Sequence, residues 1–445
     1  MIFADLLTRR TIQMKASLTA TALAIGLCPA ATMAAPNVML IIADDMGIDA
    51  SNCYSLGDQQ APMPNIEAMC QSGMVFDNAY SAPVCSPTRA TMLTGQYGIK
   101  TGVGGVVAIR GDNGLDPDTP SLFDALAGTG YSANLIGKWH LAGAGMGYDH
   151  PRQLGVPDYF GIFRGGVPDY FHWTAIEDEH EVKVDTYATT EFTDRAIQWT
   201  GAQDKPWFLW LAYNAPHAPF HLPPENLHSF HDLTDDHKAI DANPLPYYNA
   251  MLQALDTEIG RMLASMDAET RDNTVFIFVG DNGTPAQVAR NIYGRHGAKG
   301  SIYEGGIHVP LIIWGKDVQP GRTSALVNTT DIFATVAEIT GAKTDVADSI
   351  SFLPVLHGGQ SGRTYIYSEQ FSDDPPRRAD VYGWIVRQGD RKLVVLPDGT
   401  TELYDLATDP REQQNLLADG INASEQQEID TLSEIHARLA TQQAG

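Results

Sequence analysis

Two pairs of polar residues in the sequence carry the side chains that a hard metal ion prefers. Asp44 and Asp45 follow one apolar run of the chain, and Asp281 and Asn282 follow another. If both runs are strands of an open α/β sheet, their carboxyl ends meet at one edge and the two pairs converge there. Three carboxylates and one amide would then offer oxygen ligands, which suit Ca²⁺ or Mg²⁺ better than zinc. Each pair alone is also typical of an ordinary turn.

Three further polar residues follow apolar runs in the same way. Lys138 and His140 come after the run 135–137, and His217 comes after the run 211–216. Because ligands bind at the carboxyl ends of such strands, these residues are expected at the edge where the acidic pairs would meet. The sequence therefore predicts one site that is assembled from several strands.

Cys85 precedes a segment that is typical of a helix start. Ser86 can cap the helix and Pro87 can begin it, and the helix would end near Gly95. A cysteine beside a helix N-terminus lies where backbone N–H groups favour an anion, and Arg89, about one turn on, could bind the same anion. The segment alone leaves two interpretations open, a reactive thiol and a buried inert cysteine.

The elements that must position these residues follow an α/β pattern. Short apolar runs predict buried strands, and the intervening stretches 120–126 and 247–266 predict helices. The predicted strands are 38–43, 132–136, 207–212, 275–279 and 309–314. This alternation indicates a large, mainly parallel sheet that is flanked by helices.

The pattern changes after Gly358, where shorter strands predict a small C-terminal α+β subdomain with an antiparallel sheet. The predicted strands are 365–368, 383–387, 392–396 and 401–404, with a hairpin turn at 397–399 and a final helix over 424–442. We expect a signal peptide at 1–34, a catalytic domain at 35–360 and the subdomain at 361–445.

The first 34 residues and the composition indicate an exported protein. Arg9, Arg10 and Lys15 precede the short apolar stretch 16–27, and small residues at 31–34 form a cleavage site. This predicts a periplasmic or secreted location and no membrane span. The net charge of −25 argues against nucleic acid as a partner. Export would allow a disulfide between Cys53 and Cys70, although Cys53 is equally interpreted as a small buried residue.

Two segments of the sequence resemble the signatures of the type I sulfatases. Residues 85–95 match Cys-x-Pro-x-Arg followed by Leu-Thr-Gly, and residues 130–140 resemble the second signature. The likeness extends over nearly the whole chain after the N-terminal segment, including 37–45, 216–217, 281–283 and 297–306. Thr88, Ala133 and His308 depart from the residues that are common in the family, and none of these departures removes a catalytic group.

This resemblance implies the alkaline phosphatase-like fold and a formylglycine-dependent arylsulfatase-like activity. In the family, a maturation enzyme oxidises the signature cysteine, here Cys85, to Cα-formylglycine, whose aldehyde hydrate attacks the sulfur of a sulfate monoester. Carried over by position, Asp44, Asp45, Asp281 and Asn282 would hold Ca²⁺, in preference to Mg²⁺, together with the modified Cys85.

The resemblance also implies roles for the basic residues. Arg89 and Lys138 would hold the hydrate and its charge. Lys299 and His217 would bind the sulfate ester and protonate the leaving oxygen. His140 would deprotonate the second hydroxyl of the hydrate, so that sulfate is released and the aldehyde reforms.

Two other functions remain open at this point. Formylglycine-dependent phosphodiesterases and phosphonate monoester hydrolases are related, but they tend to carry Asp-His where this chain has Asp281 and Asn282, and they lack a pair like Lys138 and His140. A catalytically inactive protein that binds sulfated glycans would be indicated by loss of a signature residue such as Cys85, which is present.

The sequence narrows the substrate only to a class. Strong negative charge slows the approach of long polyanions, so a sulfated mono- or oligosaccharide or an aryl sulfate is favoured. The aromatic stretch 159–173 is interpreted either as a surface loop or as a wall over the site that stacks on a sugar or phenol. A further group of histidines is interpreted as a solvated acidic loop rather than a second metal site: His221, His228, His231 and His237.

Overall fold

A computed structural model describes residues 35–57, 59–371 and 383–441 of the chain. Contacts group the chain from Ala35 onward into one compact unit. The predicted signal peptide lies outside the described residues. Within the described residues, no helix combines the length and the apolar character needed to cross a membrane.

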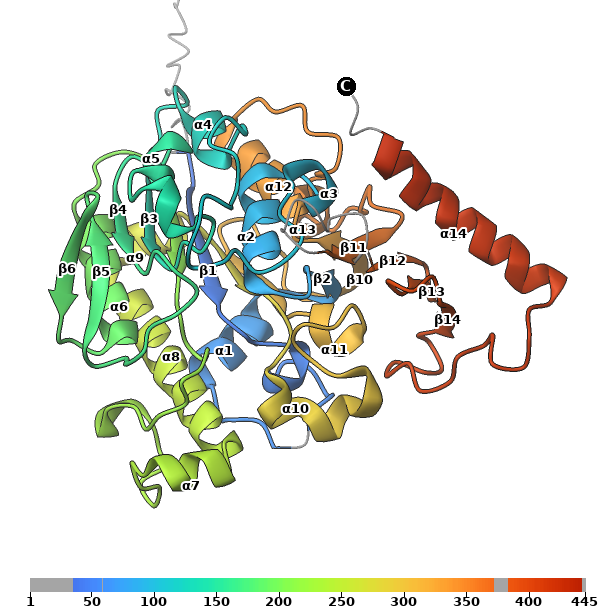
Figure 1. Cartoon of the computed structure of the whole chain (residues 1–445). Helices are drawn as coiled ribbons and strands as arrows, with labels where there is room; N and C mark the ends of the chain where they lie inside the picture. The colour runs from blue at the N-terminus through green and yellow to red at the C-terminus, as the bar shows by residue number, and fades with distance from the viewer. Residues whose placement is uncertain (1–34, 58, 372–382, 442–445) are drawn as a thin grey trace, which may run out of the picture. The chain divides into compact units, whose positions relative to one another are not determined.

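A ten-stranded mixed sheet forms the centre of this unit (Figure 1), in the order β10-β2-β9-β8-β1-β7-β3-β4-β5-β6. The neighbours β8, β1, β7 and β3 are parallel, whereas β9 is antiparallel to β8 and β5 is antiparallel to β4. The strands are β1 (Asn37–Ala43), β2 (Met74–Tyr80), β3 (Ser132–Gly137), β4 (Tyr159–Gly161), β5 (Trp173–Glu177), β6 (His180–Val184), β7 (Trp207–Ala212), β8 (Thr274–Gly280), β9 (Leu311–Gly315) and β10 (Gly321–Asn328). The predicted mainly parallel or mixed sheet is confirmed.

Helices cover both faces of the sheet. Alternate residues of β1 enter different cores, with Met39 and Ile41 in one and Leu40 and Ile42 in the other. Burial on both faces explains why β1 reads as an uninterrupted apolar run. The helices are α1 (Pro64–Ser72), α2 (Cys85–Thr94), α3 (Gly98–Thr101), α4 (Leu122–Leu126), α5 (His150–Gln153), α6 (Ala188–Gly201), α7 (His237–Ala242), α8 (Leu245–Ser265), α9 (Ala268–Asp272), α10 (Ala286–Tyr293), α11 (Glu304–Ile307), α12 (Asp331–Thr340), α13 (Leu353–Leu356) and α14 (Ala423–Thr441). Side chains of α1, α6 and α8 join the first core, and those of α2, α4 and α12 join the second.

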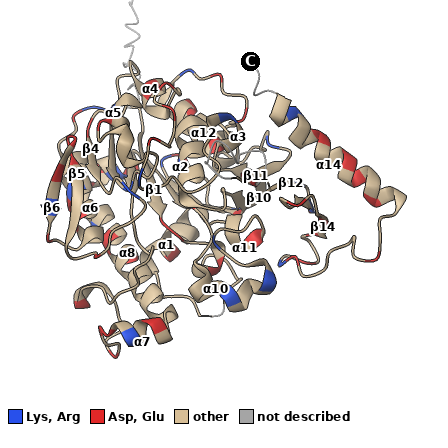
Figure 2. Ribbon diagram, in the orientation of Figure 1, with Lys and Arg blue, Asp and Glu red and all other residues tan. Residues whose placement is uncertain are grey.

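A second, antiparallel sheet lies in the C-terminal region. It contains β11 (Ile366–Gln370), β12 (Gly383–Gln388), β13 (Arg391–Val395) and β14 (Thr401–Asp405) in sequence order. The predicted turn is confirmed, because Gly399 has φ 84° and its N–H donates to the carbonyl of Leu396 at 2.9 Å. α14 packs Leu432, Ile435 and Leu439 against this sheet. Figure 2 shows that the same helix also carries acidic residues along its length. The domain boundary at 360/361 stays a prediction.

A buried ion cluster connects the second sheet to α11, the short helix that precedes β9. The ammonium of Lys392 on β13 is fully buried and lies 2.9 Å from Oε1 of Glu304 and 2.7 Å from Oε1 of Glu412. Glu412 also accepts a hydrogen bond of 2.6 Å from the backbone N–H of Glu304, the first residue of α11. This cluster fixes the start of α11, which follows the segment that carries Lys299.

Cys53 and Cys70 form a disulfide, with their Cα atoms 6.1 Å apart. The bond connects α1 to the loop that follows β1. The structure thus decides the question that the sequence left open, in favour of the disulfide. Cys85 is the free cysteine of the described residues, and it is buried.

Replacement of Lys392 tests the buried ion cluster. Lys392→Met should lower the free energy of unfolding by about 3–5 kcal/mol, because two buried carboxylates lose their cation. The neighbouring Arg391 is 41% exposed and lies 3.6 Å from Asp405 and from Glu428. Arg391→Met should therefore cost less than about 1 kcal/mol. Equal losses for the two variants in chemical denaturation would contradict the role assigned to Lys392.

Candidate active site

The ends of four neighbouring strands bring the predicted residues to one edge of the sheet. β1 is paired in register with β8, so that Asp44 and Asp45 follow β1 at the level where Asp281 follows β8. β3 is paired in register with β7, and Lys138 follows β3 at the same edge. The parallel arrangement of these strands therefore produces the cluster of polar groups.

The two acidic pairs are in hydrogen-bond contact. The backbone N–H of Asp45 donates to Oδ1 of Asp281 at 3.0 Å, and Nδ2 of Asn282 donates to Oδ1 of Asp45 at 2.8 Å. Asp44 and the other three side chains are buried. The predicted convergence of these residues is confirmed by their distances.

Cys85 enters the same cluster from α2. Its Sγ lies 3.4 Å from Oδ1 of Asp44 and 3.9 Å from Oδ1 of Asp45. Burial raises the pKa of the Cys85 thiol, so the thiol stays protonated at neutral pH. A buried, protonated thiol is a poor nucleophile in its own right.

The predicted cap of this helix is wrong. α2 begins at Cys85 itself, and Val84, at the N-cap position, makes no side-chain capping bond. The hydroxyl of Ser86 instead accepts a hydrogen bond of 3.0 Å from the N–H of Val107. The helix ends as predicted at Gly95, which has φ 70°, a conformation that glycine adopts without strain.

Three cations surround the buried carboxylates. One guanidinium nitrogen of Arg89 lies 2.7 Å from Oδ2 of Asp281, and the ammonium of Lys138 lies 2.5 Å from Oδ2 of Asp44. Lys299 reaches Asp45, with its ammonium 2.7 Å from Oδ2. Arg89 and Lys138 are buried, whereas the Lys299 side chain is 22% exposed. Lys299 is therefore the cation of this cluster that solvent or a substrate can reach.

The surroundings move the pKa values of two carboxyl groups in opposite directions. Burial alone would raise the pKa of Asp45, but the charges of His217, Lys299 and Lys138 outweigh it and lower the pKa to about 2. Burial, followed by the charge of Asp44, raises the pKa of Asp281 to about 6.

His140 follows Lys138 in a strained backbone conformation. Its φ is 56° and that of Asp45 is 72°, and such left-handed residues collect at functional sites. Burial, and then the nearby cations Lys138 and Arg89, hold the pKa of His140 well below its usual value, so its ring is neutral. Its Nδ1 is buried and has no hydrogen-bond partner. A neutral imidazole with a free nitrogen can accept a proton from a bound molecule.

His217 is held by contacts that the sequence pattern did not predict. Its Nε2 lies 3.8 Å from Oδ2 of Asp45, and burial lowers its pKa to about 4. The hydroxyl of Tyr170 donates to the carbonyls of His217 and Asn214, at 2.6 and 2.8 Å, and accepts from Nδ2 of Asn214. Tyr248 similarly donates to the carbonyl of Asp45 at 2.8 Å. The spacing of apolar residues gives no signal for such long-range hydroxyl contacts.

The backbone at two glycines, Gly165 and Gly166, lies against the rings of His140 and His217. A Cβ atom on Gly165 would lie 2.7 Å from Cε1 of His140, and one on Gly166 would lie 3.2 Å from Cε1 of His217. The backbone of this segment therefore packs directly on the edge of both rings. A side chain at residue 165 would displace the ring of His140, whereas one at residue 166 would require the ring of His217 to move by only a few tenths of an ångström.

The donor set fits a hard divalent cation. Oδ1 of Asn282 is buried and has no hydrogen-bond partner, which is costly unless another group binds it. Donor atoms from four residues also lie within 4.8 Å of one another: Asp44, Asp45, Cys85 and His217. This set includes His217 in place of Asp281 and Asn282, which belong to the set of ligands predicted from the sequence. Asp44 and Asp45 are in both sets, and their carboxylate oxygens favour Ca²⁺ or Mg²⁺.

The remaining histidines and aromatic residues mostly have structural roles. His221 packs on Tyr170, with ring centroids 4.3 Å apart, and His228 is buried, so the predicted solvated loop is wrong for these two residues. Over residues 35–57, 59–371 and 383–441, His221, His228, His231 and His237 take part in no cluster of potential metal ligands. Most aromatic rings of the stretch 159–173 are buried, which excludes a continuous stacking wall: Tyr159, Phe160, Phe163, Tyr170 and Trp173.

Comparisons with known families match nearly the whole described chain. The profile of the family described as Sulfatase matches residues 36–342. A second profile, described as N-sulphoglucosamine sulphohydrolase, C-terminal, matches residues 294–444. The first match alone covers more than half of the chain.

Several curated proteins are similar to this chain. It is 28% identical to N-acetylgalactosamine-6-sulfatase of Canis lupus familiaris, with 76% of this chain and 69% of that protein covered. It is 27% identical to arylsulfatase A of Homo sapiens, with 89% and 85% covered, and 28% identical to arylsulfatase of Klebsiella aerogenes, with 63% and 75% covered.

Solved structures share the fold. Ps i-CgsB, solved in complex with k-i-k-neocarrahexaose, has a TM-score of 0.78 and 25% identity, with 91% of this chain and 92% of that chain covered. A protein solved with its substrate D-glucosamine-2-N,6-O-disulfate has a TM-score of 0.72 and 22% identity, with 92% and 98% covered. The family match, the fold and the relatives agree, and the chain belongs to the sulfatase family of sulfuric ester hydrolases.

Proposed function

We propose that the protein hydrolyses sulfate monoesters with Cys85, converted to Cα-formylglycine, as the nucleophilic residue. The observation that carries this proposal is the place of Cys85, 3.4 Å from Asp44 inside a buried cluster of carboxylates and cations. Burial keeps its thiol protonated, which argues against a plain thiolate mechanism. The hydrate of an aldehyde at this position would supply one oxygen to attack sulfur and a second hydroxyl for the release of sulfate.

Ca²⁺ is the proposed metal, held by Asp44, Asp45, Asp281 and Asn282 with the modified Cys85. The unpartnered Oδ1 of Asn282 supports this assignment, since a metal ion would satisfy it. When bound, the ion would offset the charge of the sulfate group. Flexible coordination by carboxylate and amide oxygens favours Ca²⁺ over Mg²⁺, which demands a stricter octahedron.

The cations of the cluster would bind the charged groups of the reaction. Arg89 and Lys138 are buried beside Cys85 and would hold the hydrate. Lys299 is the partly exposed cation and would bind a sulfate oxygen and stabilise the charge that develops during transfer.

The histidines would move the protons. His217 and Lys299 both lie beside Asp45, and either could protonate the oxygen of the leaving alcohol or phenol. His217, whose pKa is about 4, would do so only after the negative charge of the bound ester had raised that pKa. Lys299 carries a proton at neutral pH, because the acidic groups near it raise its pKa despite its burial. His140, neutral and unpartnered at Nδ1, would accept the proton of the second hydroxyl.

Sulfated carbohydrates and aryl sulfates are the proposed substrate class. The similar proteins are named arylsulfatases and N-acetylgalactosamine-6-sulfatases, and the solved relative with 25% identity was crystallised with a carrahexaose. The presence of Asn282 after Asp281, and of His140 after Lys138, supports a sulfatase over a phosphodiesterase or phosphonate hydrolase. The presence of Cys85 argues against an inactive glycan-binding protein.

A periplasmic or secreted location completes the proposal. The N-terminal segment has the composition of a signal peptide. The disulfide between Cys53 and Cys70 supports an oxidising compartment. A formylglycine-generating enzyme would be the partner that matures Cys85.

Maturation of Cys85 gives the first test. Matured protein should release sulfate from an aryl sulfate and act poorly on the matching aryl phosphate. Protein produced without a maturation enzyme should fold equally well and be nearly inactive. Mass spectrometry of the peptide containing residue 85 should show loss of one sulfur and two hydrogens and gain of one oxygen. Full activity of protein with unmodified Cys85 would refute the mechanism.

Removal of the Lys299 ammonium gives the second test. Lys299→Ala should lower the rate of aryl sulfate hydrolysis by about 10²–10³-fold, the usual loss for one charge-stabilising donor. The control is Lys205→Ala, since Lys205 is exposed and lies in a loop before β7. Lys205→Ala should unfold at the wild-type denaturant midpoint, whereas Lys299→Ala should stay folded but unfold at a lower midpoint, because the buried Asp45 loses one of its cations. Wild-type turnover of matured Lys299→Ala would exclude the assigned role.

Metal removal gives the third test. Chelation should abolish turnover and lower the melting temperature, because three buried carboxylates lose a bound cation. Ca²⁺ should restore both properties, and Mg²⁺ should restore them less completely. Asn282→Ala should weaken Ca²⁺ binding, measured by calorimetry on metal-free protein. Activity and melting temperature that are both insensitive to chelation would argue against the metal site.

A further inference from the structure

Asp49 is a buried carboxylate to which the proposed function assigns no role. It lies in the loop that follows β1, as Asp45 does, and it is 5% exposed. Within the part of the chain that the structure describes, no basic side chain forms an ion pair with it. Burial raises the pKa of its carboxyl group. Because a buried carboxylate without a cation is costly, its hydrogen-bond partners indicate what it does.

Two hydroxyl groups hold this carboxylate. The hydroxyl of Tyr293, the last residue of α10, donates to Oδ1 of Asp49 at 2.9 Å. A hydrogen bond from Thr284 partly offsets the effect of burial on the pKa of Asp49. The N–H of Gly47 donates to Oγ1 of Thr284 at 3.1 Å, and a Cβ atom on Gly47 would lie 2.6 Å from Oδ1 of Asp49. Asp49 therefore connects the loop after β1 to the loop after β8 and to the end of α10.

The ring of Tyr293 contacts the segment that carries Lys299. It packs in a small apolar cluster with Ala298, the residue directly before Lys299. At the other end of the segment, a Cβ atom on Gly305 would lie 2.6 Å from Cγ of Tyr293, so the backbone of α11 lies directly on the ring. The ring therefore supports the segment on both sides of Lys299.

The same group of residues holds Lys299 itself. Its backbone N–H donates to the carbonyl of Thr284 at 3.0 Å, and its ammonium lies 2.7 Å from Oδ2 of Asp45. Asp45 and Asp49 belong to one loop. This loop therefore contacts the tip of the Lys299 side chain directly and supports the backbone of Lys299 through Tyr293. Such support fixes where a charged group lies in a site.

We propose that Tyr293, anchored by Asp49, is a positioning residue that holds Lys299 in place for the reaction. The proposal rests on the proposed function, since it takes from there the role of Lys299 in binding the sulfate group. Loss of the Tyr293 hydroxyl leaves the ring packed but frees it from Asp49, so that the segment shifts and moves Lys299. Catalysis is sensitive to such shifts, because a misplacement of about 1 Å can cost about 10²-fold in rate.

The test is a double-mutant cycle on matured, full-length protein. Tyr293→Phe should lower kcat/KM for an aryl sulfate by about tenfold, because Lys299 is misplaced. In Lys299→Ala protein, the same change should lower kcat/KM by less than about twofold, because no ammonium is left to position. A purely structural role of Tyr293 would give equal losses in the two backgrounds. Equal losses, or wild-type kcat/KM in Tyr293→Phe, would overturn the proposal.

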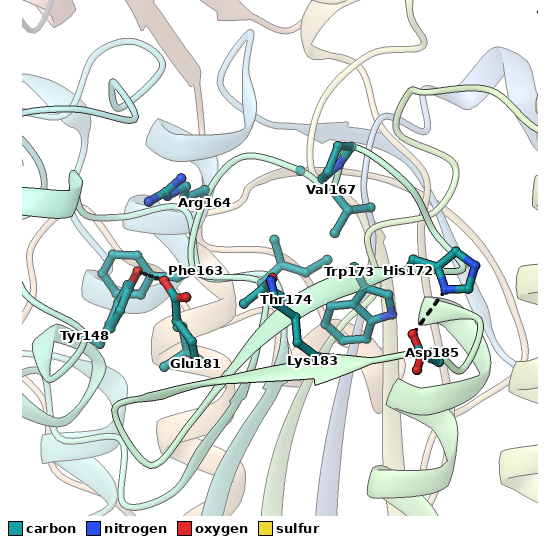
Figure 3. Close-up of a pocket in the computed structure, with 14 residues that line it drawn as sticks. Tyr148, Phe163, Arg164, Val167, His172, Trp173, Thr174, Glu181, Lys183 and Asp185 are labelled. Carbon is teal, nitrogen blue, oxygen red and sulfur yellow. Dashed lines mark hydrogen bonds and ion pairs between the residues drawn. The ribbon is translucent and has the colours of Figure 1, made fainter.

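Tyr148→Phe is the matched control. The hydroxyl of Tyr148 also donates to a carboxylate, at 2.6 Å from Oε1 of Glu181 (Figure 3). Glu181 lies on β6, which is an edge strand of the central sheet and is several strands away from β8. Tyr148→Phe should therefore leave kcat/KM unchanged in both backgrounds. A loss of about tenfold in this variant as well would contradict a specific role of Tyr293.

Hydrogen exchange tests the positioning role independently of the reaction. In Tyr293→Phe, the backbone amides of residues 294–304 should exchange faster than in wild type, whereas in Tyr148→Phe their exchange should be unchanged. Exchange at the wild-type rate in Tyr293→Phe would overturn the proposal while the sulfatase activity stands. A matured wild type that released no sulfate from any sulfate ester would instead refute the proposed function. The exchange rates would then decide whether Tyr293 holds the segment.

Discussion

The balance between three buried carboxylates and three cations is the constraint on which the active site depends. Asp44, Asp45 and Asp281 lie in the protein interior, where an unpaired charge costs several kcal/mol. The cations Arg89, Lys138 and Lys299 each contact one of them. Because these contacts join segments that are distant in the sequence, the charge balance exists only when the central strands are aligned. If the proposed divalent cation binds these carboxylates, it would leave the positive groups free to contact the proposed sulfate ester.

The C-terminal sheet contributes to this site indirectly. Its buried Lys392 binds Glu304, which begins α11 only a few residues after Lys299. The backbone of Lys299 is also held directly. Its N–H donates to the carbonyl of Thr284, two residues after Asn282, at 3.0 Å. The second sheet therefore helps to fix the one partly exposed cation of the cluster. This connection gives a physical reason for a second sheet in a protein whose site residues all lie outside that sheet.

The convergence of the site residues at one edge of the sheet could be predicted from the sequence, because each buried strand is an apolar run that is followed directly by polar residues. The uninterrupted apolar run of β1 marked a strand buried on both faces, and the polar residues after it marked its carboxyl end. Contacts without a periodic pattern could not be predicted. Tyr170 belongs to a stretch that was interpreted either as a surface loop or as an aromatic wall over the site, whereas its hydroxyl holds the backbone around His217. Ser86 was assigned a capping role because its neighbour is Pro87. Its hydroxyl instead accepts a hydrogen bond from the N–H of Val107, in a loop that follows α3.

The most direct test of the proposed mechanism is the fate of sulfate in the Cys85→Ser variant. A serine has one hydroxyl, so it can accept the sulfuryl group but has no second hydroxyl with which to release it. After incubation with an aryl sulfate and Ca²⁺, mass spectrometry should find a stable sulfate ester on the peptide containing residue 85, with release of at most one phenol per protein. Continued turnover by this variant, or sulfate attached at another residue, would contradict the mechanism.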